Sequence, residues 1–242
     1  EIFIKQINSK KHNIVFFGKF SKNIGINNTV FKLIRLLEKK KLLKKKKFQI
    51  KINKQIPNKA GLGGGSMNAA NVLKYLIKNK IIRMNKDDII KICKSIGSDV
   101  ILGLNSINTV LNSKNEIKYF KKCKKFHVLI VKPNFGCSTK YIYSKVKKIN
   151  KPKLQKPNHK MFKADFLKKL NNSLEPIALM KYPNLKSIKH YLENSLNPIF
   201  VRMTGSGSAL VAYYNSKVMC KSAKIKFSKK YKNYWCIASK TI

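Results

Sequence analysis

The pattern of hydrophobic and polar residues predicts short β-strands near the start of the chain. Residues 48–52 alternate between apolar and polar side chains, which is typical of a strand with one buried face. Residues 1–5 and 13–17 are rich in Ile, Val and Phe, and the polar residues 8–12 between them favour a turn. We therefore expect strands at all three places.

Helical spacing follows in three segments of the first half. After Asn28, a favourable N-cap residue, apolar residues recur at i, i+3, i+4 and i+7 from position 30 to 37. A second helix is expected to open near Ser66, and a third covers residues 86–96 before Gly97 ends it. Helices and strands therefore both contribute to this half.

The rest of the chain has shorter elements of both kinds. The stretch 145–160 is rich in lysine, proline and asparagine, which indicates a surface loop. Pro133 closes the first half of the chain, so we expect domains at 1–133 and 134–242. The other expected elements are strands at 100–104, 108–111, 127–131, 199–203, 209–214 and 234–238, and helices at 162–170, 183–192 and 218–227.

The net charge of +45 comes from 54 basic and only nine acidic residues. Such an excess by itself would indicate a negatively charged partner, such as nucleic acid or a membrane surface. Arginine, which suits bidentate recognition of phosphates and guanines, occurs only at Arg35, Arg83 and Arg202. Lysine far outnumbers arginine, and Asn and Ile are also abundant. This composition indicates a drift in nucleotide composition that has spread lysines over the surface, instead of a binding site for nucleic acid. A lysine-rich nucleic-acid-binding protein remains the alternative from another class.

Cysteine usage and hydropathy favour a cytoplasmic protein. The five cysteines are odd in number and include no C-x-x-C pair, as expected of reduced thiols. No run of 18 or more apolar residues occurs, and no charged start precedes a signal-like stretch, so we expect neither secretion nor membrane insertion. The four histidines are scattered, and a metal site built from them would require spatial coincidence.

The most informative segment is PNKAGLGGGSMNAA at residues 57–70, between a predicted strand and a predicted helix. Its glycines allow positive φ and bring backbone N–H groups close to an anion, and the helix opening near Ser66 adds free amides and its positive dipole end. No lysine of the Walker type follows, so a kinase of another fold is the leading hypothesis. A dinucleotide-binding loop is less favoured, because Asp87 opens a helix instead of ending a strand.

Two further places are candidates for chemistry. Asp99, in the sequence GSDV, follows a glycine at a junction between elements, where a carboxylate can accept the proton of an attacking hydroxyl. A cap or turn aspartate is an equally good interpretation. The sequence TGSGS at 204–208 lies between two predicted strands and would form either a ligand-facing loop or a plain β-turn.

Four motifs in one order together resemble the GHMP kinases: residues 57–70, 97–100, 172–176 and 203–208. The resemblance implies an α+β fold of two domains, the first like domain 2 of ribosomal protein S5 and the second ferredoxin-like. It further implies ATP-dependent phosphorylation of the 2-hydroxyl of 4-diphosphocytidyl-2-C-methyl-D-erythritol in the non-mevalonate isoprenoid pathway. Another GHMP kinase, of the homoserine or mevalonate type, is the alternative within the family.

The resemblance also implies roles for individual residues. Asp99 matches the family's catalytic base, and Mg²⁺ is expected at the Ser66 hydroxyl. ATP is expected along the glycine-rich segment, at Pro57, Asn58, Lys59, Ala60, Gly61, Leu62, Gly63, Gly64, Gly65, Ser66 and Met67.

On the substrate side, the resemblance points to Thr139, Tyr143, Thr204, Gly205 and Ser206. Tyr143 falls where the family places a ring that stacks on cytosine, and a core tyrosine is the alternative. The expected partner is a small cytidine diphosphate substrate, with no specific nucleic acid and no membrane. We expect a monomer or a weak homodimer.

Several features depart from the family's pattern. Its N-terminal lysine-bearing strand and Gly-Tyr-His segment are not found, so we expect the chain to start inside the first domain and to turn over little substrate. Met67 stands where a small hydroxyl residue is usual, and Ile101 where proline is usual. A cation near Asp99 would keep the carboxylate ionised and help to neutralise the transferred phosphoryl group, and Lys5 is a poor substitute for it.

Overall fold

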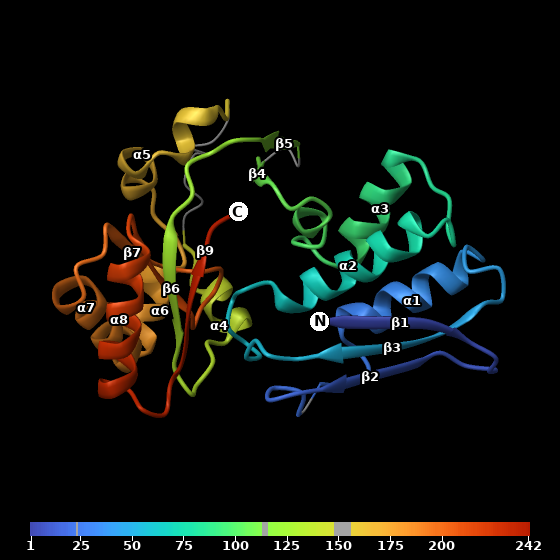
Figure 1. The fold of residues 1–242 in the computed structure, drawn as a ribbon, viewed down its shortest axis with the longest axis horizontal. Coiled ribbons are helices and arrows are strands. Elements are labelled where there is room, and N and C mark those ends of the chain that lie inside the picture. Colours follow the sequence, from blue (N-terminus) through green and yellow to red (C-terminus); the bar gives the residue numbers. More distant parts are fainter. Residues whose placement is uncertain (23, 113–115, 148–155) are drawn as a thin grey trace. The chain divides into compact units, whose positions relative to one another are not determined.

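A computed structural model of the chain describes residues 1–22, 24–112, 116–147 and 156–242. The backbone forms two compact units, which are described in turn (Figure 1). Unit 1 comprises residues 1–58 and 63–106, and unit 2 comprises residues 59–62 and 107–242. The glycine-rich segment therefore contributes residues to both units. The domain ranges expected from the sequence remain a prediction.

A three-stranded sheet forms one layer of unit 1, in the order β1-β3-β2. The strands are β1 (Ile2–Ile7), β2 (Asn13–Phe17) and β3 (Lys47–Asn53). The central strand β3 pairs antiparallel with β1 and parallel with β2. Its side chains at 48, 50 and 52 are buried and that of Lys51 is exposed, which confirms the predicted alternation.

Three helices lie on one side of this sheet, and the third of them packs against the first (Figure 1). They are α1 (Thr29–Lys39), α2 (Gly64–Lys78) and α3 (Lys86–Ile96). The buried residues of α1 are those at 30, 33, 34 and 37, as the periodicity predicts, because this stripe faces the apolar side of the unit. Helix α2 begins at Gly64, two residues before the predicted opening, so the glycines form its first turn.

The strand predicted at 100–104 is wrong, because these residues contain the 3₁₀ helix η1 (Ile101–Gly103). Val100 and Ile101 are buried, and a Cβ atom on Gly103 would lie 2.7 Å from the Cβ of Ala70 in α2. A short apolar run fits a buried strand or a buried helical turn equally well. Close packing on α2 selects the helical turn here.

Unit 2 contains a four-stranded antiparallel sheet with the order β7-β8-β6-β9. Its strands are β6 (His127–Lys132), β7 (Phe200–Met203), β8 (Leu210–Tyr214) and β9 (Trp235–Lys240). The connections run strand, helices, strand, strand, helix, strand, which is the ferredoxin-like arrangement. A separate antiparallel pair joins β4 (Asn108–Leu111) to β5 (Ile117–Phe120).

The helices of unit 2 flank this sheet on both faces. The larger core lies between the sheet and helices α6, α7 and α8, and a smaller cluster packs against α5. The sequence pattern does not predict α4, α6 or β5, because elements of four to seven residues show hardly two repeats of any period. The helical elements are α4 (Thr139–Ser144), η2 (His159–Phe162), α5 (Ala164–Lys169), α6 (Glu175–Lys181), α7 (Pro183–Ser195) and α8 (Lys217–Lys230).

Two expectations concern the chain as a whole. No helix within the described ranges is long and apolar enough to cross a membrane. All five cysteines are free thiols, as their spacing predicts. Of the surface loop predicted at 145–160, residues 148–155 lie outside the described residues.

Candidate active site

The N-terminus of α2 is open to a ligand. Its N-cap residue is Gly63, which has a φ of +62° and offers no side chain to cap the helix. The neighbouring helix α1 is different, because the Asn28 side chain accepts hydrogen bonds from two backbone N–H groups of its first turn. The first N–H groups of any helix lack an intrahelical acceptor, and they attract anions. The start of α2 therefore presents uncapped donors.

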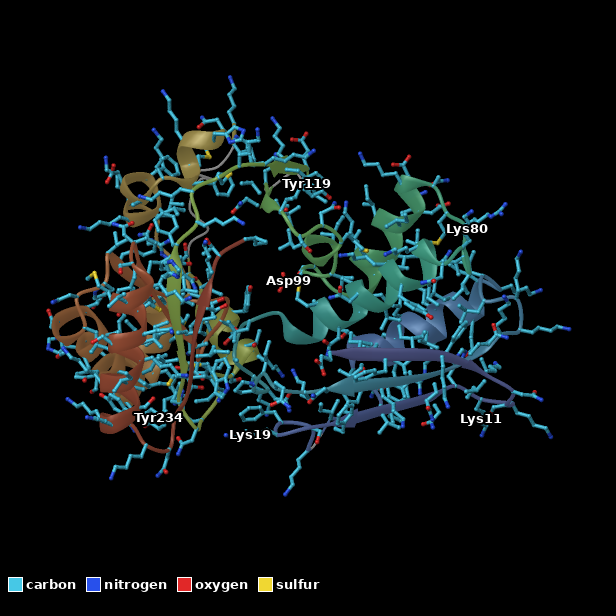
Figure 2. All side chains as sticks on the ribbon, viewed as in Figure 1. Lys11, Lys19, Lys80, Asp99, Tyr119 and Tyr234 are labelled. Atoms are coloured by element: carbon cyan, nitrogen blue, oxygen red, sulfur yellow. The ribbon has the colours of Figure 1, made fainter. Side chains whose placement is uncertain are left out.

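The carboxylate of Asp99 lies beside this helix start (Figure 2). Its Oδ2 is 3.7 Å from the position that a Cβ atom on Gly63 would take, and its Oδ1 accepts a 3.2 Å hydrogen bond from Ser98 Oγ. The residue is exposed, and η1, which follows it, has no side-chain cap. Asp99 thus occupies a turn, but its carboxylate is available to a ligand instead of serving as a cap.

Sequence reasoning missed Lys54, whose side chain is only 8% exposed. Its Nζ lies 3.2 Å from the position that a Cβ atom on Gly64 would take, so a cation lies at the first residue of α2. Burial lowers the pKa of this lysine. A signal was present, because position 54 continues the every-second-residue series of buried side chains at 48, 50 and 52. Lys5, the only substitute that the sequence offers for the family's lysine, is instead an exposed residue of β1.

The remaining residues of the first turn of α2 are held by their neighbours in unit 1. Thr29 Oγ1 donates a 2.6 Å hydrogen bond to the carbonyl of Gly65. Ser66 Oγ lies 3.8 Å from the position of a Cβ atom on Gly97. The side chain of Met67 lies against Gly103, where a Cβ atom would come within 2.9 Å of its sulfur. Met67 therefore fills space against η1, which a small hydroxyl residue would leave empty.

In unit 2, residues 59–62 pack closely on the TGSGS loop. Thr204 Oγ1 donates to the carbonyl of Gly61 at 3.0 Å, and the N–H of Ala209 donates to the carbonyl of Ala60 at 3.1 Å. A Cβ atom on Gly61 would lie 2.3 Å from the carbonyl oxygen of Thr204, so only glycine fits there. The N–H of Gly207 donates to the carbonyl of Thr204, which closes a tight turn. The turn predicted at 204–208 is therefore present, and its role toward a ligand remains a prediction.

Side chains of the motif at 172–176 hold this loop by hydrogen bonds to its backbone. Asn172 Nδ2 donates to the carbonyls of Met203 and Gly205, at 2.9 and 2.7 Å. Glu175 Oε2 accepts a 2.6 Å hydrogen bond from the N–H of Met203, and Glu175 Oε1 forms an ion pair with Lys189 Nζ at 3.4 Å. These contacts explain why the two motifs occur together: the first fixes the backbone of the second.

The predicted substrate residues are partly brought together in unit 2. The hydroxyls of Thr139 and Ser206 form a 2.8 Å hydrogen bond with each other. Thr204, Gly205 and Ser206 share the tight turn described above. Tyr143 lies on α4 and its side chain is 60% exposed, so the alternative of a core tyrosine is wrong.

Comparison with known proteins identifies the family. Residues 28–110 match the family model described as the GHMP kinases N terminal domain. A protein of Pelagibacter ubique, named 4-diphosphocytidyl-2-C-methyl-D-erythritol kinase, is 54% identical over 241 residues, which cover 100% of this chain and 86% of that protein. The chain belongs to the GHMP kinase family. A kinase with the same name from Thermodesulfovibrio yellowstonii is 33% identical over 89% of this chain and 78% of its own length.

Solved structures of GHMP kinases have the same fold. A 4-(cytidine 5'-diphospho)-2C-methyl-D-erythritol kinase superposes with a TM-score of 0.77 at 21% identity, covering 98% of this chain and 84% of that one. Homoserine kinase from Cytophaga hutchinsonii gives a TM-score of 0.73 at 14% identity, covering 100% and 85%. The predicted α+β GHMP fold and the prediction of an ATP-dependent small-molecule kinase are confirmed, and the nucleic-acid-binding alternative is not supported.

Proposed function

We propose that this GHMP kinase transfers the γ-phosphoryl group of ATP to the 2-hydroxyl of 4-diphosphocytidyl-2-C-methyl-D-erythritol. The names of the two relatives described above support this substrate over the homoserine and mevalonate alternatives. In the reaction, the hydroxyl oxygen bonds to the γ-phosphorus and the bond to the β–γ bridging oxygen breaks. ADP leaves, and the hydroxyl proton passes to a base.

Asp99 is the proposed base, and its position carries the proposal. Its carboxylate is exposed and lies beside Gly63, at an uncapped helix N-terminus that attracts phosphate. A carboxylate within hydrogen-bond reach of the attacking hydroxyl both aligns that group and accepts its proton. The hydrogen bond from Ser98 leaves Oδ2 available for this work.

The proposed ATP-binding residues are those predicted from the sequence, from Pro57 to Met67. The observation that supports them lies in unit 1, where the first turn of α2 has no side-chain cap. Its free backbone amides can donate hydrogen bonds to phosphate oxygens. Mg²⁺ would neutralise charge on the phosphates, and the Ser66 hydroxyl suits it as an oxygen ligand. Because Mg²⁺ keeps several waters and binds chiefly through substrate phosphates, it needs few oxygen ligands from the protein.

The proposed substrate-side residues are Thr139, Tyr143, Thr204, Gly205 and Ser206. An exposed ring at Tyr143 suits stacking on a base, and the linked hydroxyls of Thr139 and Ser206 suit polar groups of the substrate. We further propose that the enzyme is cytoplasmic and acts as a monomer or a weak homodimer. The free thiols of all five cysteines support a reducing compartment.

The test is a single-turnover assay of phosphoryl transfer with ATP, Mg²⁺ and the cytidine substrate. We expect Asp99→Asn to lower the transfer rate by about 10²- to 10⁴-fold, the usual contribution of a general base, with ATP affinity changed little. Asp87→Asn is the matched control, because Asp87 is an exposed carboxylate on α3, and it should leave the rate unchanged. Equal rates for Asp99→Asn and the parent chain would contradict the role of Asp99, and transfer to a group other than the 2-hydroxyl would contradict the proposed substrate.

A further inference from the structure

Lys54 is a largely buried lysine whose ammonium group has no partner among the described residues. The side chain is 8% exposed, and no described residue forms a hydrogen bond or an ion pair with its Nζ. A charge removed from water is costly unless other groups replace the lost hydration. The other buried lysine, Lys132, has such groups, because its Nζ donates to the carbonyls of Pro133 and Phe135, both at 2.7 Å.

The cation of Lys54 faces a second positive feature. Its Nζ lies 3.2 Å from the Cβ position of Gly64, the first residue of α2. A helix N-terminus carries roughly half a positive charge, and this one has no side-chain cap. Like charges repel, so the unliganded arrangement is unfavourable. An anion at this point would satisfy the ammonium and the helix amides together.

Backbone hydrogen bonds fix Lys54 directly after β3, and burial restricts where its side chain can lie. Its N–H donates to the carbonyl of Phe17 at 2.7 Å, and its carbonyl accepts from the N–H of Phe20 at 3.0 Å. Asp99 does not neutralise the ammonium, since the two groups form no ion pair. Instead, the carboxylate lies beside Gly63 and the ammonium beside Gly64, on consecutive residues at the start of α2.

We propose that Lys54 is a phosphate-binding residue, whose ammonium and the first amides of α2 together hold one phosphate group of the nucleotide. This inference rests on the proposed function and adds a cation that the glycine-rich sequence itself does not provide. An ammonium near the transferred group would also neutralise charge that develops there. Phosphate groups of ATP and of the cytidine substrate have the same chemistry, and the test separates them.

Removal of the charge gives a signature that a structural lysine would not give. In Lys54→Met the apolar stem keeps its packing and the uncompensated charge disappears. The unliganded chain should therefore melt at a higher temperature, by about 2–4 °C, while it loses affinity for phosphate. A lysine that only stabilises the fold would lower the melting temperature when replaced.

The experiment measures thermal unfolding and calorimetric binding at 0.15 M salt, which screens the exposed lysines. The ligands are ATP, the cytidine diphosphate substrate and inorganic tripolyphosphate. We expect Lys54→Met to weaken ATP binding by about 10- to 100-fold, as for the loss of a charge-assisted hydrogen bond, and to leave affinity for the cytidine substrate within twofold. Lys51→Met, an exposed lysine of β3, is the matched control and should change each affinity less than twofold.

A charge-preserving variant separates charge from packing. Lys54→Arg should retain most of the affinity for ATP if the cation is what binds. If Lys54→Met binds ATP as tightly as the parent chain, or melts at a lower temperature without ligand, the role of Lys54 is refuted while the proposed kinase function stands. Loss of affinity for the cytidine substrate instead of ATP would also refute it.

The remaining outcomes concern the proposed function. If the parent chain binds tripolyphosphate through Lys54 but takes up no ATP, the phosphate site stands and the kinase proposal fails. If the parent chain binds none of the three ligands, both proposals fail.

Discussion

Among the described residues, each unit contains one buried lysine and a glycine-containing backbone segment, and the two units use them differently. In unit 2, Lys132 donates to two carbonyls of its own chain, and the TGSGS loop is held by Asn172, Glu175 and residues 59–62. In unit 1, Lys54 has no partner among the described residues, and the start of α2 has no side-chain cap. Unit 2 thus satisfies its buried lysine and its glycine-containing loop internally, whereas unit 1 leaves donors for a ligand.

This difference has a physical lesson for locating sites. Buried polar groups are almost always paired, so an unpaired one identifies either strain or a missing ligand. Positive charge dominates the surface of this chain, and labelled lysines such as Lys11 and Lys80 point outward (Figure 2). Exposed lysines of this kind say little about function. The informative lysine is Lys54, which is largely buried and has no partner among the described residues.

The largest expected effect comes from two glycines of the segment 57–70, one in each unit. Gly61→Ala should destabilise the protein by about 3 kcal/mol or more, because Gly61 has a φ of +70° and its new Cβ would meet the Thr204 carbonyl at 2.3 Å. Gly63→Ala should cost only about 1 kcal/mol, since its φ is positive but its nearest neighbour lies 3.7 Å away. Urea denaturation measures both values. Equal losses would mean that the two positions are equally closed.

The second effect contrasts the two buried lysines. Lys132→Met should destabilise the protein by about 2 kcal/mol, because the carbonyl of Pro133 loses the donor it has in the structure. The carbonyl of Phe135 keeps the hydroxyl of Ser208 at 2.7 Å, which limits the loss. The same substitution at Lys54 is expected to stabilise the unliganded chain. Opposite signs in one denaturation series support the comparison, and equal signs would break it.

The smallest effect concerns the support of the TGSGS loop. Asn172→Ala removes the donor to the carbonyls of Met203 and Gly205 and should cost about 1–2 kcal/mol. Ser173→Ala changes an exposed neighbour and should leave stability within about 0.5 kcal/mol. Hydrogen exchange at Gly205 and Ser206 should accelerate in Asn172→Ala alone. An unchanged exchange rate would show that the turn is stable without the side chain of Asn172.

Much of the fold follows from local pattern. The alternation in β3 and the apolar stripe of α1 are each set by residues close together in the chain, so they are predictable. The 3₁₀ helix η1 is not, because burial of its apolar run against α2 decides between two conformations that suit the same residues. The short elements α4, α6 and β5 are missed because they offer too few repeats to show a period.

The sequence by itself determined the glycine-rich segment, Asp99 and the order of the four motifs, and through them the kinase family. Only the tertiary structure decided that the ammonium of Lys54 lies at the start of α2 and that Asn172 fixes the turn at Thr204. The physical reason is how far apart in the sequence the interacting residues lie. Backbone conformation depends on neighbours a few residues away, whereas desolvation of a charge and the partners of a side chain depend on segments that only folding brings together.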